Sequence, residues 1–298
     1  MCSGGGTVSI HFNIPEAEFR SKARQTKAII FDLDDTLLDS AKNISFRAMS
    51  AIRRLQARGI FISLCTARYY NVTHYYAEEI GIRGVYSAVN GCQLIDGETE
   101  AILYSEPMAE QEAVRLAQYC TELNCPFNLS IGEDSFAGGS LDPDFMNKGS
   151  KYRKKLSVSG KTARLMTRLP SPEYLRGRPV YKIVVHGSGY YDELSRYVQA
   201  NLPALQCIIT SKDVINIFPS GCDKGVGVRR IAEHMNIACE QVCTFGDFST
   251  DIPMFEAAGL SVAMGNAEKI VQERACAVTG TMDEDGVAEM LEAVFLAD

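Results

Sequence analysis

The chain has 298 residues, of which 46% are hydrophobic and 22% charged, and its formal net charge is −7. This composition is typical of a globular protein with a sizeable core, and no segment approaches the ~20 consecutive apolar residues that a membrane span needs. The acidic balance argues against nucleic-acid binding, which favours strongly basic domains, but small phosphorylated partners stay open.

The N-terminal 26 residues contain no apolar core of a signal peptide, so we do not expect export. We interpret residues 1–26 as a poorly ordered leader. Ten cysteines without a secretory signal favour free thiols in a reducing compartment, and no two of them have CxxC spacing. A cytoplasmic protein without a zinc site is therefore the expectation.

From residue 28 onward, short apolar runs alternate with helical periodicity. The pattern predicts strands at 28–31, 60–65 and 85–89, with a helix over 44–58 and a second helical stretch up to residue 80. Continuous apolar strands between helices indicate a parallel sheet that is covered on both faces.

The pattern changes at residue 93. Asp96-Gly97 lies between two strand-like arms, which is a hairpin signal, and residues 107–123 have the periodicity of an amphipathic helix. After an irregular stretch over 124–170, the pattern predicts strands at 180–185 and 205–209 with a helix near 190–201 between them. We interpret this middle section as a separate α+β unit.

The alternating pattern returns after residue 212, with helices and strands at 224–236, 242–245, 251–258, 260–264, 267–275, 276–279 and from 286. The fold class is therefore α/β, with a doubly wound parallel sheet. We predict a core domain formed by residues 27–92 and 213–298, interrupted by an inserted domain over 93–212.

Ligands of an open parallel sheet bind beyond the carboxyl ends of its strands. The polar residues that the sequence places there come from distant segments: Asp32, Asp34, Thr36, Thr66, Arg68, Asn90, Gly91, Lys224, Asp247 and Asp251. Carboxylates, hydroxyls and one lysine are therefore expected at one edge.

Asp32, Asp34 and Asp35 follow the first strand directly. A solvated turn is the ordinary interpretation of acids in this place. A calcium loop that began at Asp32 would need Gly and Glu where Leu37 and Asn43 stand. Crowded carboxylates repel one another, and a hard divalent cation relieves that repulsion. Mg²⁺ commonly takes one or two carboxylates, waters and a substrate phosphate, so we predict a Mg²⁺ site.

Four motifs occur in one order along the chain: FDLDDTLL, CTAR, Asp-Lys-Gly and GDFSTD. They resemble the four motifs of the haloacid dehalogenase (HAD) superfamily. Asn90-Gly91, MGNA at 264–267 and EDGVA at 284–288 are similar to its Cof-type phosphatase branch, and the insertion resembles the C2-type cap of that branch. The resemblance covers residues 28–288 and implies a HAD-like, Rossmann-like core with an inserted cap.

The resemblance also implies roles for individual residues. Asp32 would be the nucleophile that forms an aspartyl-phosphate, and Asp34 would be the general acid and base. Thr66 and Lys224 would hold the phosphoryl oxygens. The metal would lie among Asp32, the Asp34 carbonyl oxygen, Asp247 and Asp251, and the substrate contacts would include Arg68, Asn90, Gly91 and Asn266.

Single residues keep simpler alternatives. Asp251 could cap a helix, Arg68 could pair with a surface acid, and Asn90 could belong to a turn. Asp35 stands where the family commonly has Gly, and Asp tolerates the left-handed conformation of such a turn. The segment 147–168 carries eight Lys or Arg and no acid. We interpret it as a solvated face, with attraction of anionic substrates as the alternative.

The expected function is a Mg²⁺-dependent phosphatase that hydrolyses a small phosphorylated metabolite, such as a sugar phosphate, a nucleotide or a phosphorylated cofactor. Two alternatives remain: a phosphomutase that returns the phosphoryl group to its substrate, and a regulator that binds a phospholigand without turnover. Nothing in the sequence distinguishes among the substrates or indicates the oligomeric state.

Overall fold

The computed structural model describes residues 10–151, 154, 164–211 and 213–297. Chain packing divides it into two compact units. We call them the core unit, formed by the described residues of Met1–Ala67, Tyr75–Leu103 and Asp223–Asp298, and the inserted unit, formed by those of Arg68–His74 and Tyr104–Cys222. The predicted domain boundaries at 92/93 and 212/213 lie near these divisions and stay a prediction.

The core unit contains a six-stranded sheet whose neighbouring strands follow the order β1-β15-β14-β13-β2-β3. All its pairings are parallel except the one between β1 and β15. The strands are β1 (His11–Phe12), β2 (Ala28–Phe31), β3 (Phe61–Leu64), β13 (Val242–Gly246), β14 (Leu260–Ala263) and β15 (Ala277–Val278). Every side chain of β2 is buried, as expected for a strand covered on both faces.

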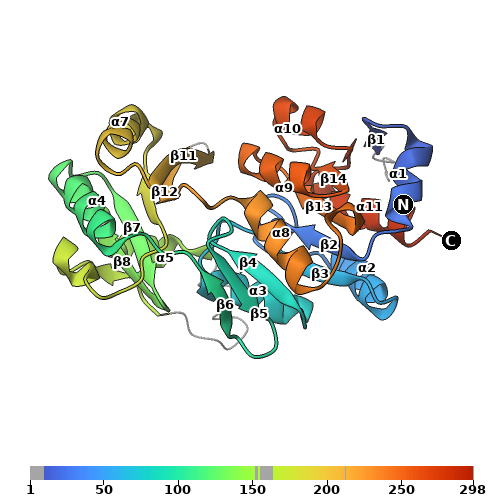
Figure 1. Cartoon of the computed structure of the whole chain (residues 1–298), viewed down its shortest axis with the longest axis horizontal. Coiled ribbons are helices and arrows are strands. Elements are labelled where there is room, and N and C mark those ends of the chain that lie inside the picture. The colour runs from blue at the N-terminus through green and yellow to red at the C-terminus, as the bar shows by residue number, and fades with distance from the viewer. Residues whose placement is uncertain (1–9, 152–153, 155–163, 212, 298) are drawn as a thin grey trace, which may run out of the picture. The chain divides into compact units, whose positions relative to one another are not determined.

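Helices cover both faces of this sheet. Figure 1 shows α8 (Lys224–His234) and α9 (Ile252–Ala257) on one side, with α1 (Glu16–Ala23), α2 (Phe46–Ala57) and α11 (Gly286–Met290) on the other. The Ser45 side chain caps α2 by accepting the Ala48 N–H at 3.0 Å, and Gly59 follows the helix with φ +80°. Further helices of the chain are α3 (Tyr70–Ile80) and α10 (Lys269–Arg274).

A small sheet of β4 (Val85–Ala88), β5 (Gln93–Asp96) and β6 (Ile102–Ser105) follows α3. An isolated parallel bridge between Cys65 and Ser87 joins the end of β3 to β4, which places the carboxyl end of β4 beside the core sheet. The predicted hairpin is confirmed, because β5 and β6 are neighbours and the Asp96 N–H donates to the Ala101 carbonyl at 2.9 Å.

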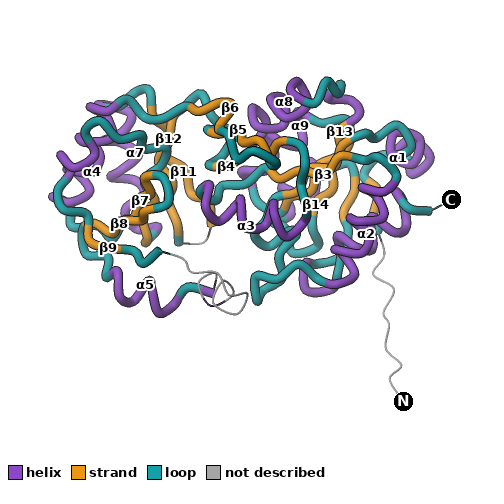
Figure 2. The backbone as a smooth tube through the Cα atoms, turned by 90° about the horizontal axis from the view of Figure 1, so that it is seen from below, coloured by secondary structure: helices purple, strands orange, loops and turns teal. Residues whose placement is uncertain are grey.

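The inserted unit is built on a mainly antiparallel sheet with the order β11-β12-β10-β7-β8-β9. Its strands are β7 (Phe127–Ile131), β8 (Asp134–Gly138), β9 (Thr167–Arg168), β10 (Ile183–His186), β11 (Leu205–Ser211) and β12 (Val214–Pro219). Figure 2 shows α4 (Glu110–Glu122) and α7 (Tyr191–Asn201) on one side of these strands. A short helix, α5 (Pro143–Gly149), follows β8.

The second half of the predicted leader differs from expectation. His11 pairs with Val278 in the sheet, and α1 buries Phe19 completely, with the Phe12 ring 5.2 Å from that of Phe19. A two-residue strand and an eight-residue helix with little apolar periodicity are hard to recognise in sequence, and their order depends on packing against the rest of the core.

No helix in the described parts of the chain has the length and apolar character that a membrane crossing requires. Half of the basic segment 147–168, namely residues 152–153 and 155–163, lies outside the described residues, so its predicted solvated face stays untested.

Candidate functional site

Asp32 is the first residue after β2, at the carboxyl edge of the core sheet. Its side chain is almost fully buried, and its N–H donates to the Phe245 carbonyl of the neighbouring β13 at 3.0 Å. Three residues on, Asp35 adopts φ +57°, which confirms the predicted left-handed turn. The turn reverses the chain directly after the strand, so that the carboxylate of Asp32 stays at the sheet edge.

Lys224 begins α8 and is buried between two carboxylates. The Asp223 side chain caps the helix by accepting the Val226 N–H at 2.6 Å, which sets the direction in which Lys224 leaves the backbone. Its Nζ lies 2.9 Å from Asp32 Oδ1 and 2.5 Å from Asp251 Oδ1. Burial by itself would lower the pKa of Lys224, but the two carboxylates raise it above its ordinary value.

Asp251 ties the loop after β13 together. Its Oδ1 faces Lys224, and its Oδ2 accepts the N–H groups of Asp247 and Phe248 at 2.9 and 3.0 Å. Asp251 makes no side-chain capping hydrogen bond to the following helix α9, so the alternative role as a helix cap is not confirmed; its carboxylate instead accepts N–H groups of the turn that leads into that helix. Both carboxylate oxygens of Asp251 therefore already interact with N–H donors.

Asp247 completes an acidic group. Carboxylate oxygens of Asp32, Asp247 and Asp251 lie within 4.8 Å of one another, and Asp247 Oδ1 accepts the Thr36 hydroxyl at 2.8 Å. The sequence predicts Thr36 at this edge without a role, and the structure shows that its hydroxyl orients Asp247.

The charges of this group do not balance. Three carboxylates against the one ammonium of Lys224 leave two negative charges in a largely buried place. Burial raises the pKa of Asp32 to about 6 and that of Asp247 to about 8, and the neighbouring carboxylates add to both increases. Asp32 Oδ1 is buried without a well-formed hydrogen bond. A divalent cation with oxygen ligands fits this donor set and its charge.

Asp34 lies outside the acidic group. Its side chain is about one-third exposed, and its Oδ1 pairs with Lys42 Nζ at 2.9 Å, while the same ammonium contacts Asp35 Oδ1 at 3.0 Å. Lys42 was missed by sequence analysis. It stands seven residues beyond Asp35 in a loop and itself has φ +65°, so nothing local in the sequence places its side chain beside Asp34.

Thr66 and Asn90 meet at the ends of β3 and β4. Both side chains are buried, and the Asn90 N–H donates to the Thr66 carbonyl at 3.0 Å. Neither polar atom of the Asn90 amide has a hydrogen-bond partner in the described part of the chain. Gly91 has φ +84°, and a Cβ there would lie 2.2 Å from the Asp223 carbonyl oxygen, so a glycine lets this turn approach the start of α8.

The remaining predicted substrate contacts have different surroundings. Arg68 belongs to the inserted unit and lines a cavity there. The Asn266 amide donates to the Asp35 carbonyl at 2.8 Å and accepts the Met282 N–H at 3.0 Å. The structure therefore gives Asn266 the task of holding two loops together, and its contact with substrate stays a prediction.

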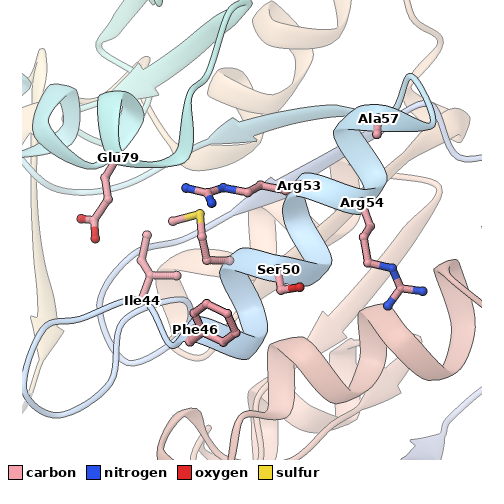
Figure 3. A pocket seen from close by; sticks show the side chains of 8 residues that line it. Ile44, Phe46, Ser50, Arg53, Arg54, Ala57 and Glu79 are labelled. Carbon is pink, nitrogen blue, oxygen red and sulfur yellow. The ribbon is translucent and has the colours of Figure 1, made fainter.

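A separate hollow of about 590 Å³ lies along the outer side of α2, between Ile44, Phe46, Arg53 and Glu79 (Figure 3). The Phe46 side chain is 90% exposed there. Ser50 and Glu79 are among its lining residues, but none of the candidate site residues named from the sequence lines this hollow. The chemistry is therefore assigned to the carboxyl edge of the sheet.

Comparison with known proteins identifies the family. The sequence profile of the haloacid dehalogenase-like hydrolases matches residues 29–291. The pyridoxal phosphate phosphatase YbhA of Escherichia coli is 25% identical over 272 residues, covering 89% of this chain and 97% of its own. A Streptococcus pyogenes protein named for a phosphatase and a peptidyl-prolyl cis-trans isomerase is 24% identical over 289 residues, or 95% of this chain, which spans 57% of its length.

A solved haloacid dehalogenase-like hydrolase from Bacteroides thetaiotaomicron has the same fold. It superposes with a TM-score of 0.77 and 26% identity, covering 91% of this chain and all of its own. The profile, the relatives and the shared fold together show that the chain belongs to the haloacid dehalogenase-like hydrolases, as a phosphatase of that family with three acidic residues that could bind a metal.

Proposed function

We propose that this phosphatase hydrolyses the phosphomonoester of a small metabolite, with Mg²⁺, through an aspartyl-phosphate on Asp32. The observation that carries the proposal is the buried Asp32 beside Lys224 at the carboxyl edge of a parallel sheet, the edge where ligands of such sheets bind. Family membership supports the same assignment.

In the first step, a carboxylate oxygen of Asp32 attacks the phosphorus atom. A bond forms between that oxygen and phosphorus while the bond from phosphorus to the ester oxygen breaks, and the leaving alkoxide takes a proton from Asp34. Lys224 faces Asp32 Oδ1, and within the described residues Asp32 Oδ2 accepts no hydrogen bond. Oδ2 is therefore the better candidate for attack.

In the second step, water attacks the phosphorus atom of the aspartyl-phosphate and gives a proton to Asp34. The bond between phosphorus and Asp32 breaks, which releases inorganic phosphate and restores both carboxyl groups. Asp34 is partly exposed, so it can exchange protons with solvent, and Lys42 Nζ holds its carboxylate at 2.9 Å. Lys42 acts here as a positioning residue.

Phosphoryl transfer depends chiefly on positioning and on neutralising charge. Lys224 supplies a positive charge that burial and its two carboxylate partners hold in place. The Thr66 hydroxyl and the unpartnered Asn90 amide supply further hydrogen-bonding groups at the ends of the neighbouring strands. We assign these three residues to the phosphoryl oxygens.

Asp32 and Asp247 would hold the metal, with Asp251 adding negative charge beside them and, as the resemblance implies, the Asp34 carbonyl as a further ligand. When bound, Mg²⁺ supplies positive charge to the phosphoryl oxygens. The two excess negative charges of the acidic group explain why a divalent rather than a monovalent cation suits it.

The test is release of inorganic phosphate by the purified chain from a panel of several dozen phosphometabolites and from para-nitrophenyl phosphate. We expect turnover with Mg²⁺ and its loss with excess EDTA. Failure to hydrolyse any of these compounds would contradict the proposal. Isomerised sugar phosphate without phosphate release would instead indicate a phosphomutase, and tight binding without turnover would indicate a regulator.

A further inference from the structure

A left-handed turn joins β4 to β5 beside the carboxyl edge of the core sheet. Three consecutive residues of this turn, Val89, Asn90 and Gly91, have φ values of +53°, +53° and +84°. Glycine adopts such angles freely and asparagine tolerates them, but the branched Cβ of valine makes them costly. The Val89 side chain is nevertheless completely buried, so the turn is fixed in a conformation that its first residue disfavours.

A second unfavourable feature lies in the same turn. Asn90 is 2% exposed, and neither the oxygen nor the nitrogen of its side-chain amide has a hydrogen-bond partner in the described part of the chain. A buried amide without partners and a strained backbone each lower the free energy of unfolding. Their combination in one turn points to a ligand that bonds to the Asn90 amide. The proposed function supplies such a ligand, namely the phosphoryl oxygens.

A strained turn keeps its conformation only where its surroundings hold it in place. On one side, the Asn90 N–H donates to the Thr66 carbonyl at 3.0 Å. On the other side, the turn packs against the start of α8, where Gly91 lies so close to the Asp223 carbonyl that a Cβ would not fit. Since Asp223 directly precedes Lys224, the turn packs against the same backbone that carries the buried lysine.

Arg230 of α8 is bonded to this turn. Its Nη1 donates to the Gly91 carbonyl at 2.8 Å, and the residue is partly buried. Arg230 stands six residues after Lys224, which corresponds to about 9 Å along the helix axis. Because the Cα–Cβ bonds of a helix tilt toward its N-terminus, the long arginine side chain can extend back along α8 to the turn. The hydrogen bond therefore joins the turn to the helix that begins with Lys224.

A guanidinium suits the task of holding this turn. A hydrogen bond from a charged donor is stronger than one between neutral groups, and the planar guanidinium fixes its direction. Thr66, Asn90, Lys224 and Arg230 all belong to the core unit, so the arrangement is complete within that unit. Without the bond from Arg230, the strained turn is freer to relax and to carry the Asn90 amide with it. Misplacement of a group by 1 Å can cost about 10²-fold in rate.

We propose that Arg230 is a positioning residue for phosphoryl transfer: its guanidinium holds the left-handed turn of Val89, Asn90 and Gly91 against α8, so that the Asn90 amide is in place when the phosphoryl group binds. Arg230 acts through Asn90 and contacts neither the substrate nor the metal. This inference rests on the proposed function, because it concerns how the Asn90 amide is presented to the phosphoryl oxygens.

The test measures kcat and KM for para-nitrophenyl phosphate in the wild type, in Arg230→Ala, in Asn90→Ala and in the double variant Arg230→Ala/Asn90→Ala. We expect each single substitution to lower kcat about tenfold. The double variant should be no slower than Asn90→Ala, because a residue that acts through Asn90 has no further effect once the amide is gone. Arg230→Lys, which retains a charged donor, should recover part of the loss. Arg229→Ala, at an exposed arginine of the same helix, is the matched control and should leave kcat unchanged.

Wild-type kcat in Arg230→Ala, or losses that multiply in the double variant, would overturn the inference. A loss of activity that only follows the unfolded fraction, measured by circular dichroism, would overturn it as well. Arg230→Gln takes the place of Arg230→Ala if the latter does not fold.

If the wild-type chain hydrolyses nothing, the proposed function fails separately, and calorimetric titration with inorganic phosphate in the presence of Mg²⁺ decides. Weaker phosphate binding by Arg230→Ala and by Asn90→Ala, with no further weakening in the double variant, supports the inference. Equal binding by all variants, or no binding by the wild type, refutes it.

Discussion

The two sheets of this molecule carry their polar residues in different ways. At the carboxyl edge of the core sheet, like charges are brought together: three carboxylates with one ammonium. On the polar face of the inserted sheet, neutral amides and hydroxyls are buried, with Asn128 and Asn216 in one row across three strands. The first arrangement suits attack on phosphorus and cation binding, whereas the second contains only neutral donors and acceptors of hydrogen bonds.

Substitutions in the two sheets should also have different effects on turnover. Residues of the core edge should affect turnover of every substrate, because each substrate presents the same phosphoryl group to them. Residues of the polar face of the inserted sheet should leave the phosphoryl-transfer step unchanged, because the proposed mechanism uses none of their groups. If the core edge is a charge-based catalytic site of this kind, substitution of its charged residues should change turnover, cation binding or stability.

The largest effect is expected for Asp32→Asn. An amide is a poor nucleophile, so kcat should fall by at least ~10³-fold for all substrates, within the range seen when a catalytic nucleophile is removed. The measurement is phosphate release, with circular dichroism to show that the fold persists. Asp39→Asn is the matched control. Asp39 accepts the N–H groups of Ala41 and Asn43 in the same loop, and the side-chain oxygen of asparagine can accept the same hydrogen bonds. Substantial turnover by Asp32→Asn would contradict the assignment of Asp32 as the nucleophile.

Much of this edge could be predicted from the sequence, because its residues stand directly after strands. The predicted strands at 28–31, 60–65 and 85–89 correspond to β2 (Ala28–Phe31), β3 (Phe61–Leu64) and β4 (Val85–Ala88). Local apolar runs specify such strands, and the order of the motifs specifies their polar ends.

Other features depend on tertiary packing and could not be predicted. Lys42, whose backbone is left-handed, pairs with Asp34 eight residues earlier, and Asn266 holds loops that are distant in sequence. The polar face of the inserted sheet becomes recognisable once strand register shows Asn128 and Asn216 in one row. The sequence of the irregular stretch over 124–170 does not indicate how these strands pair in the inserted sheet.

The second prediction concerns the charge imbalance. The pKa values of Asp32 and Asp247 are raised, to about 6 and about 8, from the 3.8 of an ordinary Asp, so the folded state holds these protons more tightly than the unfolded state does. The stability that this tighter proton binding contributes is fully present below pH ~4 and is lost as pH rises through the two raised pKa values. Without divalent cation, the free energy of unfolding should fall by up to a few kcal/mol from this contribution.

Mg²⁺ should restore most of the lost free energy of unfolding, since it neutralises the ionised carboxylates and binds the folded state preferentially. The measurement is urea unfolding at several pH values with EDTA or with Mg²⁺. Asp247→Asn, which removes one of the three charges, should flatten the profile in EDTA and reduce the stabilisation by Mg²⁺. The same pH profile with and without Mg²⁺ would show that the acidic group binds no cation.

A smaller effect is expected for Asp251→Asn. Asparagine retains an oxygen that can accept the N–H groups of Asp247 and Phe248, but it loses the charge that faces Lys224. Because we infer that Asp251 positions Lys224 more than it ligates metal, kcat should fall by roughly 10–100-fold, while the Mg²⁺ concentration for half-maximal activity should change little. A steep rise in that concentration would instead make Asp251 a ligand. Asp283→Asn, at an exposed acid that accepts the Ser40 N–H, is the control.

The smallest effect is expected at Asp35, the acid of the cluster that we assign to the turn. Asp35 has φ +57°, so Asp35→Gly relieves backbone strain, but it also removes the contact with Lys42. These opposite effects should leave the free energy of unfolding within about 1 kcal/mol of wild type. Activity should stay within about threefold, because Asp34 keeps its own contact with Lys42. Asp35→Ala loses the contact without gaining backbone freedom, so it should be the less stable of the two variants by about 1 kcal/mol in urea unfolding. A loss of turnover in Asp35→Gly comparable to that of Asp32→Asn would show that all three acids after β2 take part in the chemistry, and the core edge would then be a larger charged site than the one described.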